Sequence, residues 1–326
     1  MVTEAERHRG WRPFPQAPIP KPARPFSAMT PPDGPAHECR GDTTEDTAPR
    51  TARADGVSSI HRPRNSPATG VVDQFVRRFN AVSYGAAVLL LYAMGASALG
   101  LAFLPALWLV HRWGPGLWLT GGLAHLLGLA VLVAASLFVW GFALLVVVPI
   151  YNLILPARLH AFRGGYFTAA AVPWYLHNGL FYLVRFTFLP FVTLTPFGIL
   201  FLRAMGMRIG RRPRITTEFI SDPCMITLGD DVTIGGSAHV FCHYGGGGHL
   251  VIAPVVIGSR VTIGLKATVM GDVVIGEGAT ILAHSVLLPG TRVGAGELWG
   301  GVPARPIPRE EWDRYKTLIA RDGPSD

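Results

Sequence analysis

The stretch Ile257–Gly294 reads IGSRVTIGLKATVMGDVVIGEGATILAHSVLLPGTRVG, with an aliphatic residue at every sixth position. The residues in phase are Ile257, Ile263, Val269, Ile275, Ile281, Leu287 and Val293. Leu228, Ile234 and Val240 keep the same step earlier in the chain. Glycine follows several of these residues, and a small residue often recurs four positions after them. A fixed short period is the signature of a repeat architecture, so this region predicts a coil of equivalent units.

Each six-residue unit is expected to form one flat side of a triangular prism. The aliphatic side chain points into the prism, and the glycine after it is expected to take the sharp corner, because glycine adopts backbone conformations that other residues avoid. Three units then complete one turn of 18 residues, and each turn stacks on the one before it. This predicts an all-β domain over residues 209–308.

The residues before this domain have the composition of a membrane protein. The chain of 326 residues is 49% hydrophobic and only 15% charged, where about a quarter charged is usual for soluble domains. Residues 76–157 are expected to form a transmembrane region with one span over 82–110. The apolar stretch 117–155 would be about 58 Å long as one helix, which is too long for one span. We therefore place the second span at 127–155, with Gly116–Leu126 as connector, while three spans stay possible.

The arginines predict the orientation. They precede the first span and follow the second, with only Arg112 between them, so both termini are expected to be cytoplasmic in a multi-pass protein of the cytoplasmic membrane. Residues 158–208 are rich in aromatic residues and proline. They predict amphipathic segments in the membrane interface, with a third, hairpin-like span as the alternative. The aromatic residues expected in this interface are Trp174, Tyr175, Phe181 and Tyr182.

The remaining charge and composition limit the other regions. No acidic residue occurs between Asp73 and Glu218, and the net charge is +8. We attribute this excess to arginines against an anionic leaflet rather than to nucleic-acid binding. Residues 1–75 predict a disordered Pro-rich tail, and residues 309–326 a charged C-terminal helix and tail. Three cysteines are too few for a disulfide scaffold.

The repeat and the closing WGGVPARPI (Trp299–Ile307) resemble the hexapeptide-repeat acyltransferases, whose fold is a left-handed parallel β-helix. The lead-in FGILFLRAMGMRIG (Phe197–Gly210) and ISDPCMITLGDDVTIG (Ile220–Gly235) resemble the membrane-embedded terminal domains of nonribosomal-peptide-type enzymes such as poly-lysine synthetases. The resemblance covers about residues 150–308. It implies transfer of an acyl group from acyl-CoA, most simply acetyl-CoA, and a homotrimer with sites between subunits.

A break in the repeat indicates the candidate site. Seventeen positions separate Val240 from Ile257, instead of 12 or 18, so a loop is expected to leave the coil there. In the family that the chain resembles, a histidine in or beside such a loop is the general base, and His243 matches that position best. His249 is a competitor, and a structural role for both stays open. The resemblance makes Gly264 the candidate whose backbone N–H holds the oxyanion.

Other side chains near the loop suggest different chemistry. Cys242 adjoins His243, but neighbouring residues on an extended strand point to opposite faces, so a hydrogen-bonded nucleophile and base is disfavoured. His239 adds a further side chain of a kind that binds metals, and the same fold includes metal-binding hydratases. The spacing H-x2-C-H-x5-H nevertheless matches no firm zinc template, so no metal is expected.

The resemblance also suggests residues that bind the acyl-CoA. His284 and Ser285 lie where the family has small residues along the pantetheine groove, with a surface-facing strand histidine as the alternative for His284. Arg305 resembles the basic residue near the CoA phosphates, since a guanidinium pairs with phosphate in a bidentate manner. Lys266 is a weaker candidate of the same kind.

These observations favour a membrane-anchored acyltransferase that acts on a hydroxyl or amine of a membrane-proximal acceptor. The first alternative is an amide-bond-forming domain that takes an aminoacyl thioester from a nonribosomal-peptide-type carrier protein. The second alternative is a non-catalytic β-helix scaffold, and a metal-dependent hydratase comes after it. A carrier-protein thioester is also possible as the donor in the leading hypothesis.

Overall fold

The computed structural model describes residues 80–118, 121–155, 159–166, 168–246 and 249–314. The predicted tail 1–75 and the end of the predicted C-terminal segment lie outside the described residues. Residues 309–314 of that last segment are helical.

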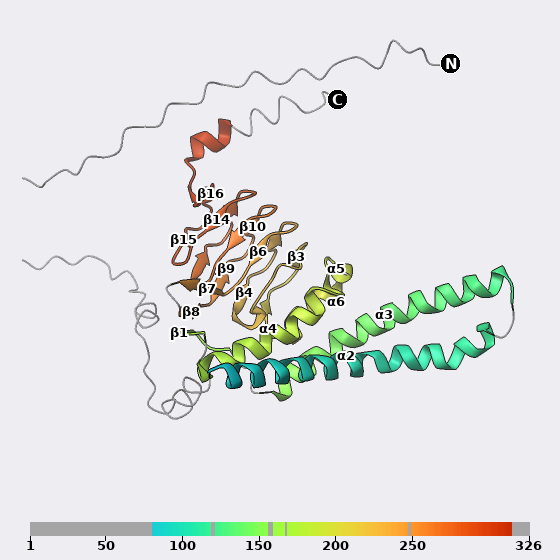
Figure 1. The fold of residues 1–326 in the computed structure, drawn as a ribbon. Coiled ribbons are helices and arrows are strands. Elements are labelled where there is room, and N and C mark those ends of the chain that lie inside the picture. The colour runs from blue at the N-terminus through green and yellow to red at the C-terminus, as the bar shows by residue number, and fades with distance from the viewer. Residues whose placement is uncertain (1–79, 119–120, 156–158, 167, 247–248, 315–326) are drawn as a thin grey trace, which may run out of the picture. The chain divides into compact units, whose positions relative to one another are not determined.

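Two long apolar helices open the described part of the chain. They are α2 (Asn80–Trp118) and α3 (Leu123–Ile154), and they pack against each other as a hairpin (Figure 1). Ala98, Ala102 and Ala106 are buried at a spacing of four residues on α2, where small side chains let two helices approach closely. The two predicted apolar helices are confirmed.

The predicted connector between these helices is too long. The helix α2 continues through Pro115 to Trp118, and α3 already begins at Leu123. Gly122 precedes α3 with a φ of 117°, a backbone conformation that favours glycine. The glycine pair therefore stands directly before α3, and residues 116–118 and 123–126 of the predicted connector are helical.

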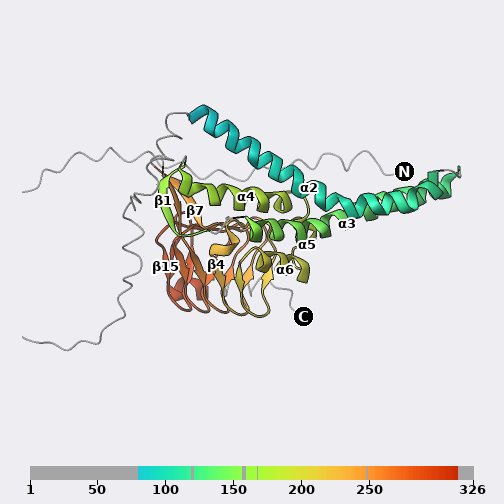
Figure 2. The ribbon, with the colours of Figure 1, turned by 90° about the horizontal axis from the view of Figure 1, so that it is seen from below.

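A layer of short helices connects this hairpin to the coil. After β1 (Phe162–Gly165) and the 3₁₀ turn η3 (Ala169–Ala171) come α4 (Val172–Arg185), α5 (Leu189–Val192) and α6 (Pro196–Ala204). Each of these α-helices has a proline in its first turn, where a missing N–H costs nothing. Figure 2 shows α4 beside the coil edge. At 14 residues, α4 is about 21 Å long, which is shorter than a span requires.

The coil has three faces of parallel strands. One face orders β17-β16-β13-β10-β5-β3, with a terminal antiparallel β17, a second orders β15-β12-β9-β4-β2, and the third orders β14-β11-β6. The strands are β2 (Arg208–Ile209), β3 (Arg214–Ile215), β4 (Ile226–Leu228), β5 (Thr233–Ile234), β6 (His239–Val240), β9 (Val255–Ile257), β10 (Thr262–Ile263), β11 (Thr268–Val269), β12 (Val273–Ile275), β13 (Thr280–Ile281), β14 (Val286–Leu287), β15 (Arg292–Val293), β16 (Leu298–Gly300) and β17 (Arg305–Pro306). The 3₁₀ turn η4 (Pro223–Met225) precedes β4.

The register confirms the predicted β-helix. Ile263 pairs with Ile281, and Ile275 pairs with Val293, so one turn is 18 residues long. All seven aliphatic residues of the repeat are at most 4% exposed. Their burial inside the prism supplies the hydrophobic stabilisation of this domain, at about 1.5–3 kcal/mol for each side chain.

The glycines of the repeat act differently from the prediction. The residue with positive φ in a turn is not the glycine after the aliphatic residue but a later one, as at Ser237, Lys266 and His284. The glycine allows adjacent turns to approach: a Cβ on Gly264 would lie 2.4 Å from the backbone nitrogen of Ala283. It is therefore required by the packing of successive turns rather than by its own φ angle.

The predicted loop is a β-hairpin. Its strands are β7 (His243–Gly246) and β8 (His249–Ile252), and β1 adds a third antiparallel strand from a distant part of the chain. Leu250 and Ile252 pack with Ala171 in a small second core under this sheet. The hairpin is thus fixed against the segment that leads into α4.

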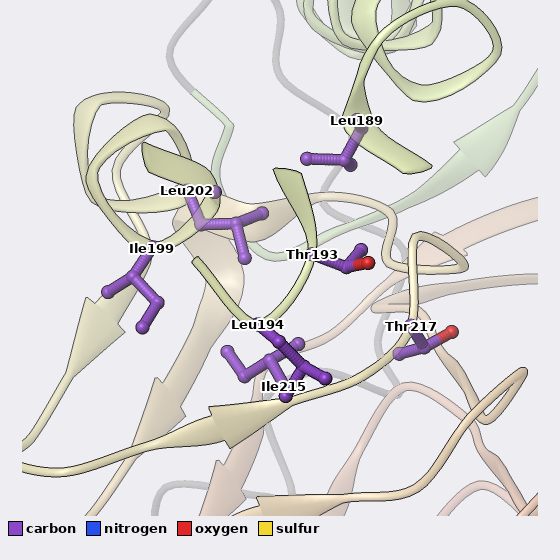
Figure 3. Close-up of a pocket in the computed structure, with 8 residues that line it drawn as sticks. Leu189, Thr193, Leu194, Ile199, Leu202, Ile215 and Thr217 are labelled. Atoms are coloured by element: carbon purple, nitrogen blue, oxygen red, sulfur yellow. The ribbon is translucent and has the colours of Figure 1, made fainter. Parts of the chain in front are cut away.

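One continuous hydrophobic core joins α2 and α3, the short helices and the interior of the coil. Phe188 packs directly on Gly141 of α3, where a Cβ would overlap its ring. Figure 3 shows a pocket between α5, α6 and β3, around Leu194 and Ile215. Its volume is only about 10 Å³, close to the minimum for one water molecule. This pocket between the short helices and the coil therefore has room for at most one water molecule.

Candidate functional site

His243 begins β7 at the base of the hairpin and forms a short contact with a buried carboxylate. Its Nδ1 lies 2.6 Å from Oδ2 of Asp222, and the two residues are 21 positions apart. The side chain of His243 is 24% exposed, whereas that of Asp222 is fully buried. The coil places the two together because Asp222 ends one turn of the coil and His243 follows the equivalent strand of the next.

Two further donors hold the carboxylate of Asp222. Asn178 Nδ2 on α4 donates to Oδ1 at 2.7 Å, and the backbone N–H of Cys242 donates to Oδ2 at 3.1 Å. Asp222 has a φ of 55° and precedes η4. Aspartate tolerates this left-handed conformation better than most residues. The carboxylate is therefore fixed by three separate parts of the chain.

These donors decide the charge of Asp222. Burial alone would raise its pKa, but the hydrogen bonds from His243 and Asn178, with the nearby His243 and His177, hold the pKa below its usual value. An ionised carboxylate only accepts hydrogen bonds, so the Nδ1 of His243 carries the proton. When the ring is neutral, its Nε2 then carries a lone pair, which is the arrangement of an oriented general base.

Helix α4 supplies two residues of the site that the sequence analysis did not identify as such. Asn178 holds Asp222, and the Trp174 ring meets the His243 ring edge-on with centroids 5.0 Å apart. These residues are four apart and lie on one helix face. Phe181, by contrast, was expected in the membrane interface, yet it is fully buried and stacks on Phe201. Its apolar ring belongs to the core because it faces α6.

The alternatives to His243 lie elsewhere. His249 is exposed and pairs with Gly246 at the far end of the hairpin, while His243 pairs with Ile252. The two histidines are therefore about 10 Å apart along the hairpin. Cys242 is fully buried, and burial and the charge of Asp222 raise its pKa well above the usual value. A protonated, buried thiol is a poor nucleophile.

The predicted ligand-binding residues occupy different positions on the coil. The Gly264 N–H donates to the carbonyl of Ile281 at 2.8 Å, so an oxyanion role would require that this bond open. Ser285 is fully buried inside the coil and cannot contact a surface ligand. His284 and Lys266 are exposed at corners with positive φ. His284 therefore lies in a turn, and the alternative that it is a surface-facing strand histidine is wrong.

Arg305 lines an open pocket of about 370 Å³ at the C-terminal end of the coil, together with Arg292 and Leu288. An apolar row leads from the site toward this pocket. Phe241, Met270 and Leu288 occupy equivalent positions on successive turns, and the Phe241 ring lies 5.6 Å from that of His243. Successive turns are about 4.8 Å apart, so the row spans about 10 Å.

A second polar group lies behind the site. His177 Nδ1 is 2.8 Å from Oδ1 of Asn152 on α3, and its Nε2 is 3.8 Å from the sulfur of Cys224. Burial lowers the pKa of His177 to about 4, and the charge of Asp222 opposes this only in part. Burial also raises the pKa of Cys224 to about 12. In the part of the chain that the structure describes, no three His, Cys, Asp or Glu side chains gather as metal ligands.

The period, the parallel register and the triangular section define a hexapeptide-repeat β-helix protein. No protein-family model matches the chain. The delta-poly-L-ornithine synthetase of Acinetobacter baumannii (strain AB307-0294) is 30% identical over 108 residues, which are 33% of this chain and 8% of the synthetase. The chain thus spans a small part of that relative.

Two solved structures are also similar. A hexapeptide-repeat acetyltransferase from Vibrio cholerae shares 27% identity with a TM-score of 0.30, covering 32% of this chain and 63% of its own. A galactoside acetyltransferase in complex with coenzyme A shares 19% identity with a TM-score of 0.32, covering 40% and 80%. The comparisons thus name the two kinds of enzyme that the sequence resembles, while the β-helix assignment rests on the strand register.

Proposed function

We propose that this chain is a membrane-anchored acyltransferase in which His243 is the general base. The observation that carries the proposal is the buried Asp222, bonded at 2.6 Å to the Nδ1 of a partly exposed His243. Holding a charged carboxylate out of water is costly unless it is fully paired. Three donors meet that requirement here, and the result is one defined tautomer of His243.

The proposed reaction begins when a hydroxyl or amine of the acceptor approaches Nε2 of His243. Nε2 removes its proton while the acceptor attacks the thioester carbonyl, and the carbonyl electrons move onto oxygen. When the tetrahedral intermediate collapses, the carbon–sulfur bond breaks, and the departing thiolate takes the proton from His243. Asp222 keeps its charge throughout and stabilises the imidazolium. The products are the acylated acceptor and a free thiol.

The donor in this proposal is acyl-CoA, with acetyl-CoA as the simplest case. The apolar row Phe241, Met270 and Leu288 suits a pantetheine arm, and the pocket with Arg305 suits the phosphates at its far end. Lys266 and His284 stay candidates for contacts with the donor. Because members of the resembled family place sites between subunits, we also propose a homotrimer, which mass measurement in detergent tests.

The membrane anchor in this proposal is the hairpin of α2 and α3. Gly85–Leu117 and Leu123–Ile154 are long and apolar enough to cross a membrane. Phe191 on α5, Leu200 on α6 and Phe186 directly after α4 are more than half exposed and would lie in the interface. Both termini would then be cytoplasmic, on the side that holds CoA thioesters.

The test replaces the base in the full-length protein in detergent. With acetyl-CoA and a panel of hydroxyl and amine acceptors, H243A is expected to release free CoA at least about 100-fold more slowly than the wild type. The matched control is H160A, which removes an exposed histidine and should leave turnover unchanged. Equal turnover in H243A and wild type would overturn the proposed base, and activity lost in H249A alone would transfer the role to His249.

Variants of the positioning residues sharpen the test. D222N is expected to approach the loss in H243A, because an amide can donate to Nδ1 and stabilise the wrong tautomer. N178A removes a bond that lowers the pKa of Asp222. Asp222 should therefore take up a proton at a higher pH in N178A than in the wild type, and the acid limb of the kcat/KM profile of N178A should move to higher pH. A merely structural role for Asn178 would lower activity without moving that limb.

A second candidate function is amide-bond formation with an aminoacyl thioester on a carrier protein. The similarity to the ornithine-polymer synthetase favours it. The same base would then deprotonate an amine, and the carrier would replace CoA. Turnover with a carrier-bound aminoacyl thioester but not with acetyl-CoA would decide for this function. Absence of turnover with both donors would favour the scaffold alternative.

A further inference from the structure

The face of α4 that holds the site continues to Arg185. Trp174, Asn178 and Arg185 follow each other at steps of four and seven residues, so they share one helix face. The first two contact His243 and Asp222. Arg185 Nη1 donates to the hydroxyl of Ser221 at 2.9 Å, directly before Asp222 in the chain. Arg185 is thus one residue away from the carboxylate that orients the base.

The surroundings of Arg185 are unusual for a cation. Its guanidinium lies 5.1–5.2 Å from the ring centroids of Tyr182, Phe186 and Phe219. Its Nε is buried without a hydrogen-bond partner. No carboxylate among the described residues forms an ion pair with it. Burial lowers the pKa of Arg185. An electrostatic interaction and a side-chain hydrogen bond with Tyr182, together with the charges of Glu218 and Asp222, offset this lowering of the pKa only in part.

A desolvated guanidinium without a counter-ion favours an anionic ligand. Aromatic faces compensate part of the lost hydration, but Nε, on one edge of the planar donor group, stays without a hydrogen-bond partner. A carboxylate or phosphate matches that edge in bidentate geometry. Phe186, one of the three rings against the guanidinium, is 67% exposed, so Arg185 lies near the surface of the protein.

We propose that Arg185 binds the anionic group of the acyl acceptor. The inference rests on the proposed function and adds a substrate class to it: the acceptor presents its hydroxyl or amine to His243 and its carboxylate or phosphate to Arg185. The contacts from Arg185 through Ser221 and Asp222 to His243 connect the two groups through one short segment of the chain. The same chemistry is available in a free metabolite or in a lipid headgroup.

The kinetic experiment compares acceptors that differ only in the anion. The pairs are ornithine with 1,4-diaminobutane, glycerol 3-phosphate with glycerol, and phosphatidic acid with diacylglycerol in mixed micelles. In the wild type, the anionic member of the productive pair should have a KM at least about 10-fold lower. R185M should abolish that difference, because the KM of the anionic member should rise to that of the neutral member. A preference for the anionic member in the lipid pair alone would identify the acceptor as a lipid headgroup. The same preference in a soluble pair would identify the acceptor as a free metabolite.

Two variants keep the test decisive. R185K preserves the positive charge but not the two parallel N–H donors of the guanidinium, so an intermediate KM for the anionic member is expected. R214M removes an exposed arginine of β3 and should keep the wild-type preference. An anion preference that persists in R185M, or an equal loss with both members of each pair, overturns the inference.

A binding measurement separates this inference from the proposed function. Inorganic phosphate or acetate should raise the thermal unfolding midpoint of both wild type and H243A by about 2 °C or more, and should not raise that of R185M. This outcome without any acyl transfer would refute the proposed function and retain the anion site. Acyl transfer without a rise of the unfolding midpoint in phosphate or acetate would retain the proposed function and refute the anion site.

Discussion

Asp222 is held by side chains that are distant in sequence, and this explains why it was not predicted as a site residue. Its partners Asn178 and His243 lie 44 and 21 positions away. No local pattern marks such a pairing. The one available signal is Asp222-Pro223 at the junction between two turns of the coil, where a polar residue interrupts the apolar period. His243 was predictable only because a loop and a family resemblance pointed to it.

His177 provides a prediction for the dependence of stability on pH. It is fully buried, and burial lowers its pKa to about 4. Between pH 6.5 and 4 the unfolded chain therefore binds a proton that the folded chain does not. The free energy of unfolding should fall as pH is lowered through this window, by about 3 kcal/mol in total from this residue.

The measurement is the thermal unfolding midpoint in detergent between pH 7 and 4.5. The decline with falling pH should be steeper in wild type than in H177Q, which cannot be protonated. The comparison uses slopes, because H177Q also alters the contact with Asn152 and shifts the starting stability. Parallel slopes would mean that His177 titrates near its ordinary pKa, contrary to its burial.

At the scale of single elements, the repeat predicted the strands well and their corners less well. The inward positions follow from hydrophobic period alone, because each aliphatic residue needs the interior. The role of the glycines depends on contacts between turns, which the sequence of one turn does not contain. The helix ends near Gly121 and Gly122 were misplaced for a related reason: apolar composition gives no stop signal before the glycine pair.

Gly264 tests this account of the glycines. A Cβ there would lie 2.4 Å from the nitrogen of Ala283, whereas nothing lies within 4 Å of a Cβ on Gly278, whose φ is 69°. G264A should therefore cost about 3 kcal/mol or more through a clash between turns. G278A should cost only about 1–2 kcal/mol through its backbone conformation. Chemical unfolding in detergent measures both, and equal losses would show that φ alone matters.

At the scale of the whole molecule, the continuous core joins the apolar hairpin to the site through α4. The sequence predicted the apolar helices and the coil, but not the contact between them through α4. Hydropathy identifies a span, and the period identifies a coil. Neither indicates that a helix outside the coil supplies Asn178 and Trp174. That information is tertiary, since it arises from which face of α4 docks on the coil.

The membrane proposal predicts a labelling pattern. Gly121 lies in the connector of the hairpin and Ala295 on an exposed corner of the coil. In a variant whose native cysteines are replaced, G121C should react with a membrane-impermeant thiol reagent from outside intact cells. A295C should react only in inverted vesicles. Labelling of both positions from the same side would contradict the orientation that the arginines indicate.

Because every regular turn of the coil has 18 residues, the length of the coil depends only on the number of its turns. Each added or deleted turn changes the separation between His243 and the Arg305 pocket by one strand spacing, about 4.8 Å, and preserves the phase of every inward residue. Residues 258–275 are one such unit. Under the proposed function, a change in the number of turns would alter the length of donor arm that the protein accepts, and would leave His243, Asp222 and α4 unchanged.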